Sequence, residues 1–362
     1  MNGEVVYYFI YDVGASIDLK KVESKFGKKR PAEISTIHPK PPTVTFPTPF
    51  EMKLDDAVLE TEAGSIRFSV TGKFFSIGVI SVCLRTAFTV GSLDELQRYN
   101  EPKIKYEHGD RLDDFARNLK EKLRKDISDY ILEMYEFESI PETYTIFCIV
   151  GDAPALGESI REISALLVNE KKKEDLSAKE MEDVTKYWYS YHQHDLAVVD
   201  WNAAFIAEPE GKYEDILLVL EIANSQLLEL RTYDEYLDRV LDEAYDDVEA
   251  SLSRRVFPIS TRPILMELSK DRIAMTEFTD EIMSITKFFG DWYLAKIYMG
   301  ISEKLRLKEW QSIVNDKLQT LSELYNILRQ ELEARRMLML EAMIVLLFML
   351  DIVLVLVQVL RG

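Results

Sequence analysis

The sequence is poor in the residues that mark disulfide-rich, metal-binding and nucleotide-binding proteins. Among 362 residues it has two cysteines, four histidines and 14 glycines. Two cysteines do not make a disulfide scaffold in a chain of this size, and a free buried cysteine behaves as a small hydrophobic residue. Because Cys83 and Cys148 both stand in apolar, strand-like segments, we expect free thiols and a reducing compartment.

Positive charge is also scarce relative to negative charge. The formal net charge is −19, from 44 Lys and Arg against 63 Asp and Glu. Direct nucleic-acid binding is not expected, because it depends on cations that neutralise phosphates. The one short basic run, Lys28, Lys29 and Arg30, is interpreted as a solvated turn.

Catalytic and cofactor motifs are missing. The sequence has no Walker loop, no Gly-x-Gly-x-x-Gly and no Gly-x-Ser-x-Gly, so no catalytic residue, no metal and no cofactor is predicted. The nearest approach to a metal site is His192 with His194, which on a strand would project to one face. Two histidines are half a site, and the alternative is a solvated loop.

The first 210 residues predict an α+β domain. The N-terminus lacks the basic and apolar regions of a signal peptide. Alternating or β-branched segments predict strands, and amphipathic segments predict helices. The expected strands cover residues 5–11, 57–61, 66–71, 74–85, 144–150 and a pair within 196–207, with a turn at Gly72; the expected helices cover 18–26, 112–140, 156–169 and 177–187, and a Pro-rich connector covers 31–49.

The remaining chain predicts long helices, over residues 213–255, 280–299 and 301–332. Apolar residues in the third recur at spacings of four and three, which is typical of a helical hairpin or coiled coil. They are Trp310, Val314, Leu318, Leu321, Tyr325, Leu328 and Leu332. This seam packs either against the helix of residues 213–255 or against another chain. The expected domains are 1–210, a helical stalk at 211–335 and a membrane anchor at 336–360.

One stretch of the first long helix places polar residues among leucines. Because buried carboxylates and amides must be hydrogen-bonded or paired, we expect a structural polar network there rather than an acid–base pair. Its predicted members are Glu221, Asn224, Glu229, Arg231 and Asp234.

Residues 337–360 are apolar except for Glu341, Asp351 and Gln358. As a helix this stretch is about 36 Å long, against a hydrocarbon core of about 30 Å, which predicts a C-terminal transmembrane anchor. The alternative is a buried helix of a soluble protein. Arg335 and Arg336 precede the stretch, and only Arg361 and Gly362 follow it. The positive-inside tendency therefore places the body in the cytoplasm, at the cell inner membrane.

The polar residues of the anchor predict association between membrane helices. Asp351 lies near the middle of the apolar stretch, and Gln358 is seven residues further along, on the same helical face. An ionised Asp there costs about 2.5–3.5 kcal/mol. A partner helix would satisfy it, and so Glu341, Asp351 and Gln358 are predicted to support a homo-oligomer. The alternatives are a protonated Asp351 facing lipid and a proton or ion relay.

Several segments of the helical half together resemble the required-for-meiotic-nuclear-division family in its bacterial-type form. They are residues 224–234, residues 290–298, Trp310 with Lys317-Leu318, and Leu340-Glu341 through Asp351. The sequence differs from the family in having Asp351 where Glu is usual and Ala342 where Trp is common. The resemblance implies a membrane-anchored, non-enzymatic protein. Eukaryotic members of that family sit at the mitochondrial inner membrane and are associated with organellar translation, and no catalytic residues carry over.

We therefore expect an α+β domain on a helical stalk, anchored in a membrane and acting as a scaffold or tether that binds a protein partner. Two alternatives stay open. A transport protein of the CorA type would have this layout, but it needs a second span and a Gly-Met-Asn loop, which the sequence lacks. A metal-dependent enzyme would use His192 and His194.

Overall fold

The computed structural model describes residues 1–27, 49–61, 64–132, 139–253 and 292–361. Three expectations lie outside these residues: the basic run at 28–30, the Pro-rich connector except for its last residue, and the first part of the helix expected at 280–299. The described residues form an α+β structure with long helices and a C-terminal apolar helix, which confirms the expected fold class. They divide into two compact units, one of residues 1–232 and 292–311, the other of 233–253 and 312–361. The expected domain boundaries stay a prediction.

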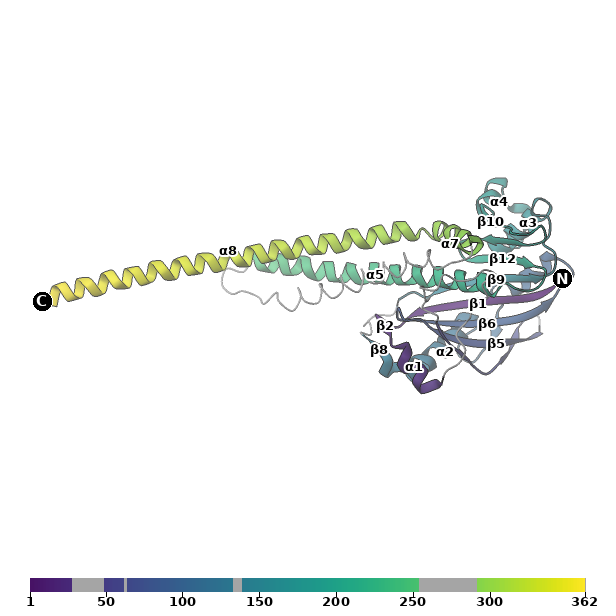
Figure 1. Ribbon diagram of the computed structural model, residues 1–362, viewed down its shortest axis with the longest axis horizontal. Coiled ribbons are helices and arrows are strands. Elements are labelled where there is room, and N and C mark those ends of the chain that lie inside the picture. The colour runs from purple at the N-terminus through teal and green to yellow at the C-terminus, as the bar shows by residue number, and fades with distance from the viewer. Residues whose placement is uncertain (28–48, 62–63, 133–138, 254–291, 362) are drawn as a thin grey trace. The chain divides into compact units, whose positions relative to one another are not determined.

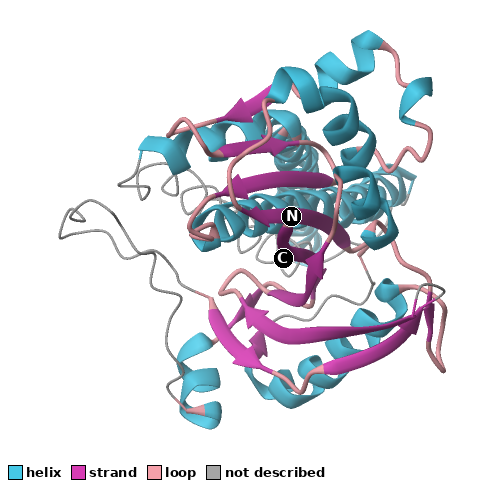
Figure 2. Ribbon diagram, turned by 90° about the vertical axis from the view of Figure 1, so that its right-hand side faces the viewer, coloured by secondary structure: helices cyan, strands magenta, loops and turns pink. Residues whose placement is uncertain are grey.

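The first unit is built on a mixed sheet, whose strands are magenta in Figure 2. In the described residues it has ten strands in the order β10-β11-β12-β9-β1-β6-β5-β4-β7, with β3 paired to β5. Neighbours are antiparallel except for the parallel pair β9 and β12. The strands are β1 (Asn2–Asp12), β3 (Phe50–Lys53), β4 (Ala57–Thr61), β5 (Gly64–Phe74), β6 (Val79–Thr89), β7 (Ile104–Lys105), β9 (Glu142–Val150), β10 (Tyr187–Tyr189), β11 (Leu196–Val199) and β12 (Ala203–Glu208).

Strand β1 lies at the centre of the sheet, and its side chains point alternately to the two faces. Val5, Tyr7 and Phe9 belong to the core on one face, whereas the alternate residues face the other way. That core is covered by short helices: α1 (Leu19–Phe26), α2 (Leu112–Ile127) and α3 (Leu156–Leu167). The smaller elements are β2 (Ser16–Ile17) paired with β8 (Ile131–Leu132), α4 (Ala178–Val184), and the 3₁₀ turns Leu93–Tyr99, Ser128–Tyr130 and Lys173–Asp175.

The turn expected at Gly72 is wrong. Strand β5 continues through Gly72 to Phe74, and the chain reverses four residues later, where Gly78 has a φ of 89°. A Cβ at Gly72 would lie 2.8 Å from the Leu123 side chain of α2. Glycine is therefore needed at this position for the close approach of a helix, not for a reversal of the chain.

Two expected helices end early. Helix α2 stops at Ile127, not at residue 140, because the chain turns through Ser128–Tyr130 and enters β8, which pairs with β2. Helix α4 stops at Val184, and the residues after it form the edge strand β10. In both places pairing with a distant strand overrides the local helical pattern.

The long helices are α5 (Glu214–Ser253), α7 (Trp292–Lys304) and α8 (Leu307–Arg361), and Figure 1 shows each with its label. The break between α7 and α8 is at Arg306, whose φ of 53° interrupts the helix. In the second unit, Lys317 of α8 is paired with Asp234 and Asp238 of α5. Val314, Leu321 and Tyr325 of the predicted seam are buried there, so the chain itself covers this part of the seam.

Candidate functional site

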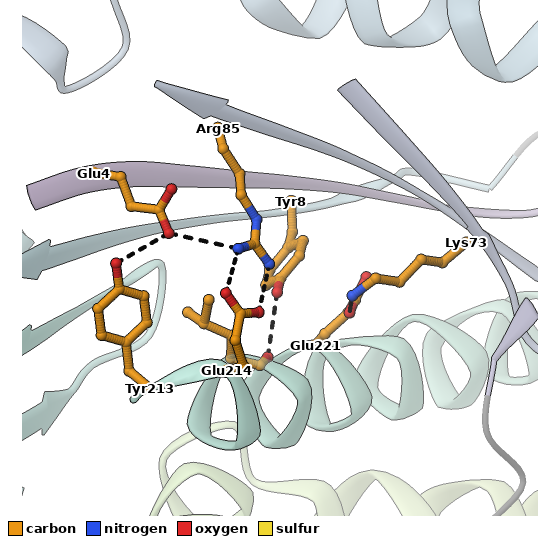
Figure 3. Close-up of polar contacts among 8 residues, drawn as sticks. Glu4, Tyr8, Lys73, Arg85, Tyr213, Glu214 and Glu221 are labelled. Atoms are coloured by element: carbon orange, nitrogen blue, oxygen red, sulfur yellow. Dashed lines mark hydrogen bonds and ion pairs between the residues drawn. The ribbon is translucent and has the colours of Figure 1, made fainter. Parts of the chain in front are cut away.

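The face of the sheet opposite the α1–α3 core is covered by the first half of α5, and it buries polar as well as apolar side chains. Glu4, Tyr8 and Asp12 of β1 point to this face because they are spaced by multiples of two. The Tyr213 hydroxyl donates to Glu4 Oε1 at 3.1 Å, and the Tyr8 hydroxyl donates to the Leu217 carbonyl at 3.4 Å. Figure 3 shows the side chains of Glu4, Tyr8 and Tyr213 with these contacts as dashed lines. These two hydrogen bonds thus join β1 to the start of α5 and to the residue that precedes it.

At the middle of this face lies a buried ion pair between Lys73 of β5 and Glu221 of α5. Lys73 Nζ is 2.5 Å from Glu221 Oε2, and the side chains are 7% and 0% exposed. The Ser81 hydroxyl of β6 donates to the other oxygen, Oε1, at 2.6 Å. Both carboxylate oxygens of Glu221 are therefore satisfied by groups that reach it from two strands.

The charge of Lys73 is maintained by its surroundings. Burial alone would lower the pKa of Lys73, but the Glu221 carboxylate opposes this, and the net pKa lies above the ordinary value. The ammonium also lies 5.6 Å from the centre of the Tyr8 ring, within the range of a cation–π contact. Lys73 is thus held by one anion and one aromatic face, and its side chain is 7% exposed.

A second charged cluster holds the N-terminal end of α5. Arg85 of β6 donates to both oxygens of Glu214, at 2.6 and 2.8 Å, and lies 3.5 Å from Glu4. Burial would raise the pKa of Glu214, but the hydrogen bonds from Arg85 hold it below its ordinary value. Glu214 is also in the first turn of α5, where the helix dipole favours negative charge. Since its side chain is 63% exposed, we expect this cluster to contribute less than the Lys73–Glu221 pair.

The far end of β1 carries a carboxyl group that titrates near neutrality. Asp12 Oδ1 accepts from the Gly14 amide at 3.0 Å, and Thr232 of α5 lies beside it. Burial raises the pKa of Asp12 from 3.8 to about 7, although these two contacts lower it. Asp12 is thus the group on this face whose charge changes close to physiological pH.

The predicted polar residues of α5 have separate partners. Glu221 pairs with Lys73, and the Asn224 amide donates to the Leu220 carbonyl one turn earlier at 2.8 Å. Arg231 pairs with Glu142 of β9. Asp234 pairs with Lys317 in the second unit, and Glu229 is buried. The residues on the opposing strands, Lys73, Ser81 and Asp12, were not found from the sequence. A lysine inside an apolar strand was the available signal for Lys73.

His192 and His194 lie in the exposed turn between β10 and β11. The backbone amide of His192 donates to Asp195 Oδ1 at 3.0 Å, which is an ordinary turn contact. His194 Nδ1 is 3.9 Å from Asp152 Oδ2, with both side chains mostly exposed. Over the described ranges no group of three His, Cys, Asp or Glu residues is placed to hold a metal ion.

The two cysteines are free and buried. Burial raises the pKa of Cys83 to about 11 and that of Cys148 well above its ordinary value. A thiol must ionise to act as a nucleophile or a metal ligand. Both cysteines therefore behave as core residues, as expected from their apolar segments.

The polar face is closed to a substrate. Lys73, Ser81 and Glu221 are 5%, 0% and 0% exposed. The ammonium, hydroxyl and carboxylate groups of this face are therefore surrounded by protein. A buried pair of this kind fixes the position of one element against another. The arrangement therefore locks the helix that leads out of the domain onto the central strands.

The second candidate region is the end of α8. Residues Arg336–Val357 form one helix that is long and apolar enough to cross a membrane, with a mean hydropathy of 2.8 and no buried residue. Glu341 and Asp351 are exposed on it. A shallow apolar groove along one of its sides is lined by Ala342, Val345, Leu346, Met349, Leu350 and Val353.

Comparisons with known proteins agree on one family. The family model described as the N-terminal domain of the uncharacterized protein MJ0711 matches residues 2–214. The uncharacterized protein MJ0711 of Methanocaldococcus jannaschii is 25% identical over 243 residues, which cover 67% of this chain and 74% of that protein. No solved structure matches the chain. Membership of an uncharacterised family is thus confirmed, whereas these matches do not support the required-for-meiotic-nuclear-division family or a bacterial-type member of it.

Proposed function

This chain belongs to the family of the uncharacterized protein MJ0711, and we propose that it is a membrane-anchored tethering protein. Its α+β unit binds a protein partner, and the end of α8 holds that unit at a membrane. The observation that carries the proposal is the wholly exposed apolar stretch Arg336–Val357. An apolar helix that the described residues leave uncovered is stabilised by an apolar environment, and a bilayer provides one over this length.

The continuity of α8 supports the tethering role. Helix α8 runs for 55 residues from Leu307 to Arg361 without a break. Its first part is held beside α5 by the pairs from Lys317 to Asp234 and Asp238. The span therefore continues a helix whose preceding part is paired with α5 in the second unit.

The proposal puts the body on the cytoplasmic side of a cell inner membrane. Arg335 precedes the span and Arg336 is its first residue, and positive residues favour the cytoplasmic flank. Two buried free cysteines suit a reducing compartment. The buried polar groups beneath α5 contact one another, which suits a structural role in holding this helix on the sheet.

Membrane integration is tested with the variant Leu346→Lys and its control Leu346→Ala. A lysine at the centre of a span costs about 2.5–3.5 kcal/mol on insertion scales, so we expect Leu346→Lys to shift from the membrane to the soluble fraction after alkaline carbonate extraction. Leu346→Ala should stay in the membrane with the parent protein. A parent protein that carbonate extracts completely would refute the anchor.

The tethering role is tested by proximity crosslinking in native membranes, with and without the span. The full-length protein should crosslink reproducibly to one protein partner. In cells with the Leu346→Lys variant, less of that partner should be found in the membrane fraction. The topology is read from protease protection of the same membranes. A body shielded inside sealed vesicles of inverted orientation would refute the cytoplasmic placement.

A further inference from the structure

The membrane stretch carries its own heptad pattern. Leucines recur every seven residues at Leu340, Leu347 and Leu354, and three residues before each of them stand Met337, Ile344 and Asp351. These six positions are the a and d sites of a helical seam, with Leu at every d site. Their five apolar side chains are each more than half exposed. A regular seam without cover is thus present over this stretch.

This seam is distinct from the one that the chain already covers. In the second unit the buried residues Val314, Leu321 and Tyr325 form a seam against α5. The heptad positions of the membrane stretch are two residues out of step with that seam, so they lie on a different side of α8. The membrane seam is therefore not a continuation of the intramolecular packing.

Asp351 at an a site cannot be satisfied by its own chain within the membrane. The only cation within the span is Arg336 at its beginning, and 15 residues of helix separate the two by about 22 Å. An isolated carboxylate at this depth is costly. Asp351 therefore requires a group supplied by another helix at the same depth.

We propose that this seam pairs two copies of the chain as a parallel two-helix dimer in the membrane, with Asp351 against Asp351. The inference rests on the proposed membrane anchorage. Two copies inserted in the same direction place each Asp351 at the same depth, and two carboxyl groups in contact share a proton so that one donates and the other accepts. Leu at d with Ile at an a site favours two parallel strands, and a polar a residue fixes their register.

A second copy fits better than a different membrane protein. The d-site leucines pack against identical leucines in a two-fold parallel pair. Glu341 stands beside the d site Leu340, outside the seam, near the end where Arg336 lies. The dimer thus assigns different roles to the two acids: Asp351 joins the helices, and Glu341 does not.

The geometry is tested by single cysteine substitutions and oxidative crosslinking in native membranes. The native Cys83 and Cys148 are buried, so the parent protein gives the background. We expect dimers from the seam positions and none from the groove on the other side of the helix. The seam variants are Leu340→Cys, Leu347→Cys and Leu354→Cys; the matched controls are Leu346→Cys, Met349→Cys and Val353→Cys.

The outcomes separate the dimer from the anchor. Crosslinks at the control positions, an even pattern, or a product whose mass shows a different protein would overturn the pairing of two copies. Carbonate extraction of the same variants reports the anchor independently. Variants that stay in the membrane without seam crosslinks refute the dimer alone, whereas variants that carbonate extracts refute the proposed function.

The role of Asp351 is tested by its conservative and apolar replacements. Asp351→Asn keeps a group that both donates and accepts, so the dimer should persist. Asp351→Leu should weaken dimerisation by about three- to thirtyfold, as expected for one hydrogen bond between membrane helices. Glu341→Leu should leave it unchanged. Dimerisation is measured by fluorescence energy transfer during dilution in detergent, and equal affinities for Asp351→Leu and the parent would overturn the role of Asp351.

Discussion

Two regions of this chain reverse the usual relation between polarity and burial, and they do so in opposite directions. The first half of α5 buries Glu221, Asn224 and Gln226 almost completely, whereas the apolar stretch Arg336–Val357 of α8 has no buried residue. On α5 each named polar group has a partner within the first unit. For the apolar side chains of the stretch Arg336–Val357, the described residues of the chain provide no cover. Burial therefore follows from the available partner, not from polarity alone.

The two regions also differ in the free-energy cost that each must offset. A buried ion pair recovers its desolvation penalty only while both partners are present. An exposed apolar helix loses about 25 cal/mol for each Å² left in water, and a bilayer removes that cost along the whole length. The charged groups of the α5 face are thus held by partners in the first unit and are sensitive to single changes, whereas the α8 stretch depends on its surroundings.

The largest effect is expected at the buried pair. Glu221→Leu should lower the free energy of unfolding by about 3–5 kcal/mol, because it leaves the Lys73 ammonium buried without a counter-charge. The double variant Glu221→Leu with Lys73→Met should recover most of this loss, because neither charge remains. The free energies come from urea unfolding of the detergent-solubilised protein, followed by circular dichroism.

The control is Glu243→Leu, at an exposed position of the same helix, which should change stability by less than about 0.5 kcal/mol. If the double variant were as unstable as Glu221→Leu, the loss of stability would not come from an unpaired buried charge. The view of the α5 face as a set of mutually satisfied partners would then need a different basis, such as packing.

The next effect concerns pH. The folded state holds the Asp12 proton more tightly than the unfolded chain, because the pKa rises from 3.8 to about 7 on folding. The contribution of Asp12 to the free energy of unfolding is therefore largest below pH 4 and falls as the pH rises to about 7. A shift of this size corresponds to on the order of 4 kcal/mol. Asp12→Asn should abolish this fall and be more stable than the parent above pH 7.

The measurement is the urea midpoint at half-unit steps between pH 3.5 and pH 8. Asp55→Asn, at an exposed position, removes the same charge and should leave the shape of the parent profile intact. Parallel profiles for the parent and Asp12→Asn would show that Asp12 is as well solvated when folded as when unfolded.

The sequence predicts the elements whose pattern is local. Strand β1 was expected from its alternation, α5 from its helical period, and the apolar stretch of α8 from its length. Each of these signals lies within one segment, so no distant residue is needed to interpret it. The same is true of Glu221, whose position among leucines indicated that it would be buried.

The sequence does not predict what depends on distant partners. Lys73 is 148 residues from Glu221 in the chain, and nothing in either segment indicates the other. Gly72 resembled a turn residue, yet its role is set by Leu123 of α2. The helix expected to run to Tyr187 ends at Val184, because Tyr187 belongs to β10 and pairs with Val199 of β11. Tertiary contacts override local propensity at all three places.

The smallest effect is expected where an ion pair is neither fully buried nor fully exposed. Lys317 of α8 lies 2.5 Å from Asp234 and 2.6 Å from Asp238, and its side chain is 21% exposed. Water still reaches these groups, so the pair should contribute about 0–1 kcal/mol. Lys317→Met should therefore lower the free energy of unfolding several times less than Glu221→Leu, and 1 M salt should reduce the difference further.

Lys308→Met, at an exposed position of the same helix, corrects for the loss of one positive charge from an acidic protein. The difference between the two variants isolates the contacts of Lys317 with α5. If this difference in the free energy of unfolding were as large as the effect of Glu221→Leu, exposure to water would not determine how much these ion pairs stabilise the protein. The contrast between the closed α5 face and the solvated second unit would then lie in geometry, because Lys317 bridges two carboxylates whereas Lys73 meets only one.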